Sequence, residues 1–208
     1  MDVYCVTAPA ESFTCNAYLL TGERTALVDA GAYADVVDEI EAHTSDLDVV
    51  ALTHQHGDHV AELPAVAEAF DPAVEAYADH SLRTNAIDDG DAIRLGDETF
   101  EVVYTPGHAD DHVSFVSETT LFSGDVVVHD DGAFEYGSFG RTDMAGQSRD
   151  TLIESIERLL DRLPASVEHL YAGHGDAFHG DAFHGDVRDV VETALERARR
   201  REPKYPDE

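Results

Sequence analysis

The stretch THQHGDH at residues 53–59 carries three histidines and one aspartate within six residues. It directly follows residues 48–53 (DVVALT), an apolar run of strand length that we expect to be buried on both faces. His54 and His56 are two positions apart, so a strand end or turn can direct both rings to one centre. Gly57 allows a sharp turn before the second pair of ligands. Neutral imidazole and carboxylate are the groups that divalent transition metals prefer, so the stretch predicts a metal site.

Three further candidate ligands occur in turns later in the chain. His108 ends the turn TPGH, Asp125 ends SGD, and His174 lies in AGHG, so a glycine stands beside each of them. Each turn directly follows a run of strand length, and loops at strand ends are where α/β proteins place their sites. The three strand-length runs cover residues 99–104, 120–122 and 167–171.

The number of candidate ligands indicates two metals rather than one. A single tetrahedral zinc needs three or four ligands, whereas seven are enough for two ions about 3.5–4 Å apart with one bridging carboxylate. Such a pair activates water as hydroxide near neutral pH, so the reaction needs no serine or cysteine nucleophile. The seven candidates are His54, His56, Asp58, His59, His108, Asp125 and His174.

The order HxHxDH, TPGH, SGD and GH resembles the metallo-β-lactamase superfamily over about residues 1–175. The resemblance implies an α/β fold, a four-layer αββα sandwich, as a single domain over residues 1–201 followed by a polar tail at 202–208. It also implies that Asp29 of the motif VDAG supports the ligands from behind. His112, four residues after His108, is expected to be structural rather than a ligand. By the same resemblance, His54, His56 and His108 hold one metal, Asp58, His59 and His174 hold the other, and Asp125 bridges them.

The segment GRTD at residues 140–143, followed by a helix and YAGHG, resembles the glyoxalase II and persulfide dioxygenase branch. It implies a metal-dependent hydrolase, a thioesterase of glyoxalase II type, in which a metal-bound hydroxide attacks an acylated small thiol. Asp58 would be a ligand and would also orient the hydroxide. The cofactors would be two divalent ions, zinc first, with iron or manganese as alternatives.

Three other functions stay open. The first is a persulfide dioxygenase with a single iron held by His54, His108 and Asp125. The second is a nuclease or phosphodiesterase, which the absence of a basic patch disfavours. The third is a non-catalytic, metal-stabilised binding protein, which the complete ligand set disfavours.

Residues 129–148 are rich in glycine and aromatic residues and show no periodicity, so we expect a functional loop there. Arg141 would bind a substrate carboxylate or pair with Asp143. Tyr136 and Phe139 would line the pocket or pack the loop.

A tandem repeat, GDAFHGDAFHGD, fills residues 175–186. One interpretation is a local duplication in a surface loop. The alternative is that His179 or His184 reaches the nearby active site.

Composition places the chain among acidic globular proteins. Its 208 residues include 44 acidic and 13 basic side chains, a net charge of −31, and 43% hydrophobic residues. This charge repels nucleic acid and anionic membranes, and we expect a halophilic, cytoplasmic protein with a small-molecule partner. We see no signal peptide and no run of 18 apolar residues. Cys5 and Cys15 are expected to be reduced, with a cross-strand disulfide as the alternative, and a homodimer stays open.

Several elements follow from local patterns. Helices are expected over residues 35–42, 61–70, 149–163 and 187–201 from apolar residues at helical spacing. A meander of short strands is expected at residues 3–7, 17–20 and 25–29, with further strands at 74–77 and 113–116.

Overall fold

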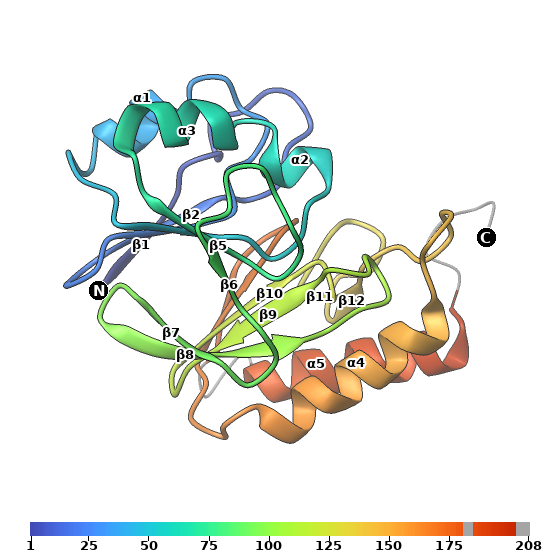
Figure 1. Ribbon diagram of the computed structural model, residues 1–208. Helices are drawn as coiled ribbons and strands as arrows, with labels where there is room; N and C mark the ends of the chain where they lie inside the picture. The colour runs from blue at the N-terminus through green and yellow to red at the C-terminus, as the bar shows by residue number, and fades with distance from the viewer. Residues whose placement is uncertain (181–184, 203–208) are drawn as a thin grey trace.

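The computed structural model describes residues 1–180 and 185–202 and has the four-layer α/β architecture that the sequence predicts. Two six-stranded sheets lie face to face, with α1 and α3 on one outer side and α4 and α5 on the other (Figure 1). The αββα sandwich is therefore confirmed.

The first sheet has the strand order β1-β2-β3-β4-β5-β6, which follows the sequence. Its first three strands form the expected antiparallel meander, and β3 to β6 run parallel. The strands are β1 (Asp2–Cys5), β2 (Tyr18–Thr21), β3 (Ala26–Val28), β4 (Val49–Ala51), β5 (Ala73–Ala76) and β6 (Asn85–Ala86).

The second sheet has the order β14-β13-β10-β9-β8-β7. Only β10 and β13 pair in parallel, and the other neighbours are antiparallel. The strands are β7 (Ala92–Leu95), β8 (Glu98–Tyr104), β9 (Val113–Val116), β10 (Thr120–Gly124), β13 (His169–Ala172) and β14 (Phe178–His179), and a separate ribbon pairs β11 (Val127–Val128) with β12 (Ser138–Phe139).

The two long helices, α4 and α5, begin at residues whose side chains satisfy free backbone N–H groups. Ser148 and Asp186 accept hydrogen bonds from backbone N–H groups three residues later, at 3.2 and 2.8 Å, and so cap α4 and α5. Pro64 lies in the first turn of α3, the position where a helix tolerates proline. The helices are α1 (Val36–Glu41), α2 (Gly57–Val60), α3 (Leu63–Phe70), α4 (Arg149–Arg162) and α5 (Val187–Arg200).

Three hydrophobic cores hold the four layers together. One lies between the first sheet and α1 and α3, with Ile40 and Leu63 among its members. Another lies between the sheets and contains Phe100, Phe115 and Phe122. The last core packs α4 and α5 against the second sheet and includes Leu152, Ile156, Val190 and Ala194.

The strand directions bring the loops with the candidate ligands together. The strands β10 and β13 run parallel, and β8 has the same direction because two antiparallel steps separate it from β10. The loops that follow β8, β10 and β13 therefore leave the same edge of the second sheet. The loop after β4 joins them from the first sheet.

Local patterns missed several short elements. The strand β7, whose residues alternate between exposed and buried, directly follows the acidic residues 88–91 and was not expected. The histidine-rich loop contains the single turn of α2, and the aperiodic segment 129–148 contains β12. The strands β6, β11, β12 and β14 have only two residues each, too few to show a period. His184 and residues 203–208 of the expected tail lie outside the described part of the chain.

Among the described residues, none of the helices combines the length and the apolar character needed to cross a membrane.

Candidate metal centre

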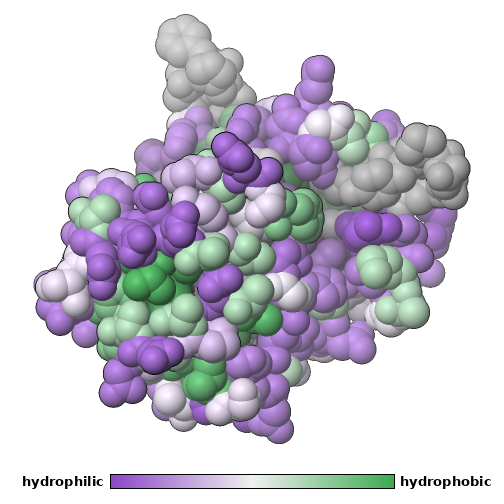
Figure 2. Space-filling model, turned by 90° about the horizontal axis from the view of Figure 1, so that it is seen from above, coloured by the Kyte–Doolittle hydropathy of each residue, from purple (hydrophilic) through white to green (hydrophobic). Residues whose placement is uncertain are grey.

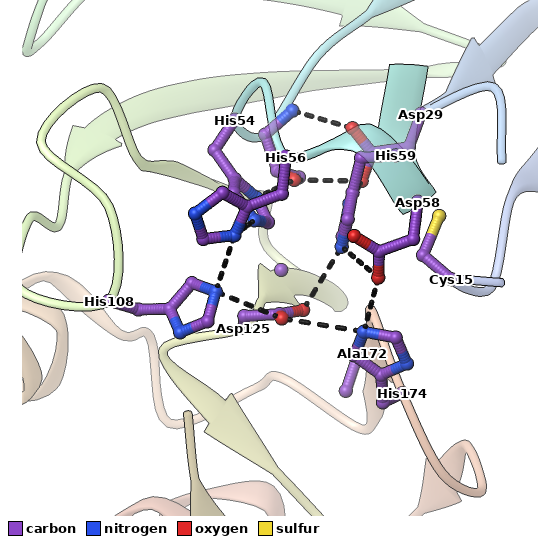
Figure 3. Close-up of polar contacts among 12 residues, drawn as sticks. Cys15, Asp29, His54, His56, Asp58, His59, His108, Asp125, Ala172 and His174 are labelled. Carbon is purple, nitrogen blue, oxygen red and sulfur yellow. Dashed lines mark hydrogen bonds and ion pairs between the residues drawn. The ribbon is translucent and has the colours of Figure 1, made fainter. Parts of the chain in front are cut away.

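One set of histidine rings gathers at the end of β4 and beside the turn that follows β8. His54 Nε2 and His108 Nε2 each lie 3.0 Å from His56 Nδ1, so three ring nitrogens converge (Figure 3). All three ligand atoms fall within 4.8 Å of one another. This spacing suits three nitrogen ligands of one ion.

A second set lies beside the first. The single turn of α2 carries Asp58 and His59, and His174 follows β13. Asp58 Oδ2 lies 3.1 Å from His174 Nε2 and 3.8 Å from His59 Nε2. The three ligand atoms again fall within 4.8 Å, so they could hold another ion.

Asp125 lies between the two sets, as Figure 3 shows. Its Oδ2 atom is 3.2 Å from His108 Nε2 in the first set and 3.5 Å from His174 Nε2 in the second. Its Oδ1 atom is 3.4 Å from His59 Nε2. One carboxylate thus faces ligands of both sets, which is the position a bridging ligand needs.

Two buried polar atoms in the centre fit a metal directly. His59 Nε2 and Asp125 Oδ1 are buried and have no hydrogen-bond partner among the described residues. A buried polar atom without a partner costs free energy, so most are satisfied in folded proteins. A divalent ion between these atoms would satisfy both, and the set of imidazoles and carboxylates suits zinc, iron or manganese.

Asp29 supports the ligands from behind. Its carboxylate accepts hydrogen bonds from the Thr53 backbone N–H at 2.8 Å and from the Thr53 hydroxyl at 2.7 Å. It also lies 2.9 Å from His59 Nδ1, and Thr53 Oγ1 is 3.1 Å from His54 Nδ1. These contacts hold two ligand rings in place, the arrangement that metal sites use to orient histidine.

The pKa shifts of three candidate ligands match a metal site. Burial lowers the pKa of His54 well below its ordinary value and also lowers the pKa of His108, so both rings are neutral. Burial alone would raise the pKa of Asp125, but its close contact with His59 outweighs burial and holds that pKa well below its usual range. Neutral imidazole and ionised carboxylate are the forms that bind metals.

His112 packs behind the centre and has no free ring nitrogen. Its Nε2 accepts a 2.9 Å hydrogen bond from the Asp125 backbone N–H, so Nδ1 carries the proton and donates to the Thr105 hydroxyl at 2.8 Å. Burial lowers the pKa of His112 to about 3, so the ring stays neutral. The contacts agree with the expected structural role.

The backbone of the GRTD segment, residues 140–143, contacts two of the candidate ligands. The Arg141 carbonyl accepts a 3.0 Å hydrogen bond from His108 Nδ1 and so orients that ligand. A Cβ on Gly140 would lie 2.0 Å from the Asp125 carbonyl oxygen, so only glycine fits there. The Arg141 guanidinium makes two 2.8 Å bonds to Asp143, the ion pair that the sequence offered as one alternative.

A cavity of about 800 Å³ opens over the ligands. Its size suits a small-molecule site. Phe13 and Met144, two exposed apolar side chains, line it together with Arg141. Other lining residues include His56, Asp58, His108, Asp125, Asp130, Asp131, His174 and Asp176.

Some singled-out residues lie elsewhere. Tyr136 packs against His129 and Phe178, with ring centroids 5.6 and 5.9 Å away, and does not line this cavity. Phe139 is fully buried in the core beneath α4 and α5. His179, on β14, contacts His169 of the neighbouring strand β13 and does not take part in the metal centre.

Phe13 is a cavity residue that sequence reasoning missed. It lies in the loop between β1 and β2, is 78% exposed, and stacks on His174 with ring centroids 5.1 Å apart. A lone aromatic residue in a polar loop gives no periodic signal, so its place became visible only with the fold. Cys15 was not linked to the site either, yet it is a free, buried thiol whose sulfur lies within 4.8 Å of ligand atoms of Asp29 and His59.

Figure 2 shows one face of the molecule, on which hydrophilic side chains predominate and hydrophobic side chains gather in patches. This agrees with the excess of acidic residues in the sequence.

Several known proteins are similar to this chain in sequence or in fold. The hydroxyacylglutathione hydrolase of Francisella philomiragia is 42% identical over 116 residues, which cover 53% of this chain and 46% of that protein. The chain spans less than half the length of the curated relatives it matches first.

Two solved structures extend the comparison. The crystal structure of TTHA1623 in a di-iron-bound form is 28% identical, with a TM-score of 0.63 over 79% of this chain and 89% of that one. ETHE1 from Myxococcus xanthus, at 24% identity, shares the fold with a TM-score of 0.67 over 93% of this chain and 89% of that one. The family profile of the metallo-beta-lactamase superfamily matches residues 11–201, and the chain therefore belongs to that superfamily.

Proposed function

We propose that the chain is a dinuclear metal-dependent hydrolase that cleaves thioesters of small thiols, in the manner of glyoxalase II. The observation that carries the proposal is the position of Asp125 between two complete ligand sets. In this proposal His54, His56 and His108 hold one ion, Asp58, His59 and His174 hold the other, and Asp125 bridges them.

Relatives support the thioester as substrate and two metals as cofactors. The relative at 42% identity is named a hydroxyacylglutathione hydrolase, and the structure at 28% identity is a di-iron-bound form. Zinc is the ion we favour for this chain, since imidazole and carboxylate suit it well. Iron and manganese remain alternatives that the same ligand types accept.

The bound ions would supply a water-derived nucleophile near neutral pH and would polarise the thioester carbonyl. Asp58 contributes in a further way because its side chain lines the cavity and stays 21% exposed. Its contact with His174 fixes one carboxylate oxygen, so the carboxylate can orient the attacking water. Phe13 and Met144 offer apolar contacts to the substrate at the cavity wall.

The test measures release of free thiol from a panel of acylated small thiols, with the metal-loaded protein in high salt. We expect hydrolysis by the wild type and a loss of about 100-fold in Asp58→Asn, because a misplaced attacking water costs about that much in rate. Asp161→Asn, an exposed aspartate on α4, is the matched control and keeps full activity. A metal-loaded protein that cleaves none of the thioesters would overturn the proposal.

A single-iron persulfide dioxygenase is the second candidate. Its ligands would be His54, His108 and Asp125, and the 3.2 Å distance from His108 Nε2 to Asp125 Oδ2 is compatible with this set as well. Oxygen consumption with a persulfide of a small thiol separates the candidates. Oxygen uptake without thioester cleavage would replace the hydrolase by the dioxygenase.

A further inference from the structure

Outside the metal centre, two histidine side chains meet on the outermost pair of strands of the second sheet. His169 begins β13 and His179 ends β14, and the antiparallel register places them directly opposite each other. Their Nδ1 atoms lie 3.0 Å apart, and their ring centroids are 5.0 Å apart. The function proposed above uses neither residue.

The register explains why the rings meet. The backbone N–H of Gly180 donates a 2.7 Å hydrogen bond to the Glu168 carbonyl, which makes the adjacent His169–His179 pair a non-hydrogen-bonded pair. At such positions the Cα atoms approach to about 4.5 Å and the side chains are closest. Both rings therefore extend from the same face of the sheet.

The spacing of the two nitrogens is the spacing of metal ligands. Two metal–nitrogen bonds of about 2.0–2.1 Å place the nitrogens about 2.9 Å apart at a right angle and about 3.3 Å apart at the tetrahedral angle. The observed 3.0 Å lies between these values. It also equals the His54–His56 and His56–His108 spacings in the candidate metal centre.

The exposure and the packing of the His169 and His179 rings suit the binding of an ion. His179 is exposed and His169 half-buried, so an ion can reach them from solvent. Burial, reinforced by the neighbouring His169, lowers the pKa of His179, so that ring is neutral. The Tyr171 ring packs against His179 with centroids 5.7 Å apart and at 74°, which restricts the movement of the imidazole.

We propose that His169 and His179 form a second metal site, which takes one divalent ion of the imidazole-binding class, such as Ni²⁺, Cu²⁺ or Zn²⁺, with water as the remaining ligands. The site is separate from the catalytic centre, because His169 lies five residues, or about 16 Å of extended chain, before His174. The ion would tie the two-residue edge strand β14 to β13. This gives His179, in the first copy of the tandem repeat, a role other than catalysis.

Nickel binding to the untagged holoprotein tests this site. The protein, with its own metals bound, is dialysed against micromolar Ni²⁺, and nickel and the native metals are counted separately by elemental analysis. Separate counts distinguish an added nickel from one that replaces a catalytic ion. We expect one added nickel per chain, no loss of native metal, and a higher melting temperature.

Two variants of the histidine pair and one control variant test whether the nickel binds at this pair. His169→Gln and His179→Gln should each lose the added nickel while keeping their native metals and hydrolase activity. His169 lies outside the tandem repeat, so its variant separates the pair from binding by the repeat alone. His43→Gln removes an exposed histidine that stacks on Tyr4 and should bind nickel as the wild type does. Nickel uptake that is absent in the wild type, or unchanged in either pair variant, would overturn the proposal.

Discussion

His59 Nδ1 lies 2.9 Å from Asp29 Oδ2, and this contact decides which ring nitrogen faces the metal centre. A carboxylate only accepts hydrogen bonds, so Nδ1 carries the proton. Nε2 is then the ring nitrogen that faces the centre, 3.4 Å from Asp125 Oδ1. Asp29 thus positions a proposed metal ligand, and it also accepts two hydrogen bonds from Thr53, the residue before His54.

Replacement of Asp29 by asparagine should therefore weaken metal binding. The amide cannot accept from all three donors at once, so His59 or Thr53 loses its partner. We expect a drop in metal affinity of about 10- to 100-fold, the usual effect of losing such a supporting group. The rate at which a chelator removes metal from the folded protein measures it.

Two comparisons separate positioning from general damage in this variant. Asp161→Asn should release metal at the wild-type rate. Excess metal should restore much of the activity of Asp29→Asn, because the ligands themselves are intact. Wild-type metal release from Asp29→Asn would contradict the positioning role.

Replacement of Phe13 by alanine should raise KM. The ring is 78% exposed and lines the cavity, so its removal costs the fold little but takes apolar contact from a bound substrate. A loss of about 1–2 kcal/mol of binding corresponds to a KM about 5- to 30-fold higher. Steady-state kinetics check this, and Phe13→Tyr, which keeps the ring, should stay close to the wild type. An unchanged KM in Phe13→Ala would exclude this ring from the substrate site.

Cys15 should be unreactive in the folded protein. The side chain has no exposed surface, and burial raises its pKa to about 12. At pH 8 only about one thiol in ten thousand would be ionised, and the thiolate is the reactive form. Alkylation followed by peptide mass spectrometry should label the partly exposed Cys5 first and Cys15 only after unfolding. Equal labelling rates in the native state would contradict the burial of Cys15.

Elements whose sequence patterns are long or chemically specific could be predicted from the sequence. The helix at residues 149–163 was predictable because its apolar residues recur at helical spacing, and the structure has α4 at Arg149–Arg162. β7 was missed although its residues alternate between exposed and buried, because it has only four residues and an acidic turn directly precedes it. Two-residue strands such as β14 exist only through pairing with a neighbour, which no local pattern records.

The sequence also predicted some features of the candidate site and not others. Ligand residues are dense in the sequence and follow strands, so their convergence was predictable. The hydrogen bond from His108 to the Arg141 carbonyl could not be predicted. Any residue at position 141 offers a backbone carbonyl, so this contact across 33 residues does not depend on the residue type there. The sequence did not indicate whether the Tyr136 side chain faces the cavity or the interior. In the structure its ring packs on His129 and Phe178.

Stability should rise with salt concentration. A net charge of −31 on 208 residues makes the folded chain repel itself, and salt screens that repulsion. A gain of about 3 kcal/mol would raise the melting temperature by roughly 6–12 °C. Calorimetry between 0.1 and 2 M KCl measures the change. A melting temperature that is flat or falls over this range would contradict the halophilic interpretation of the charge.

Metal content per chain tests the central claim most directly. The protein is purified without chelators in high salt and analysed for zinc, iron and manganese. Two ligand sets that share Asp125 should retain about two divalent ions per chain. A single iron with no second metal would contradict the dinuclear centre.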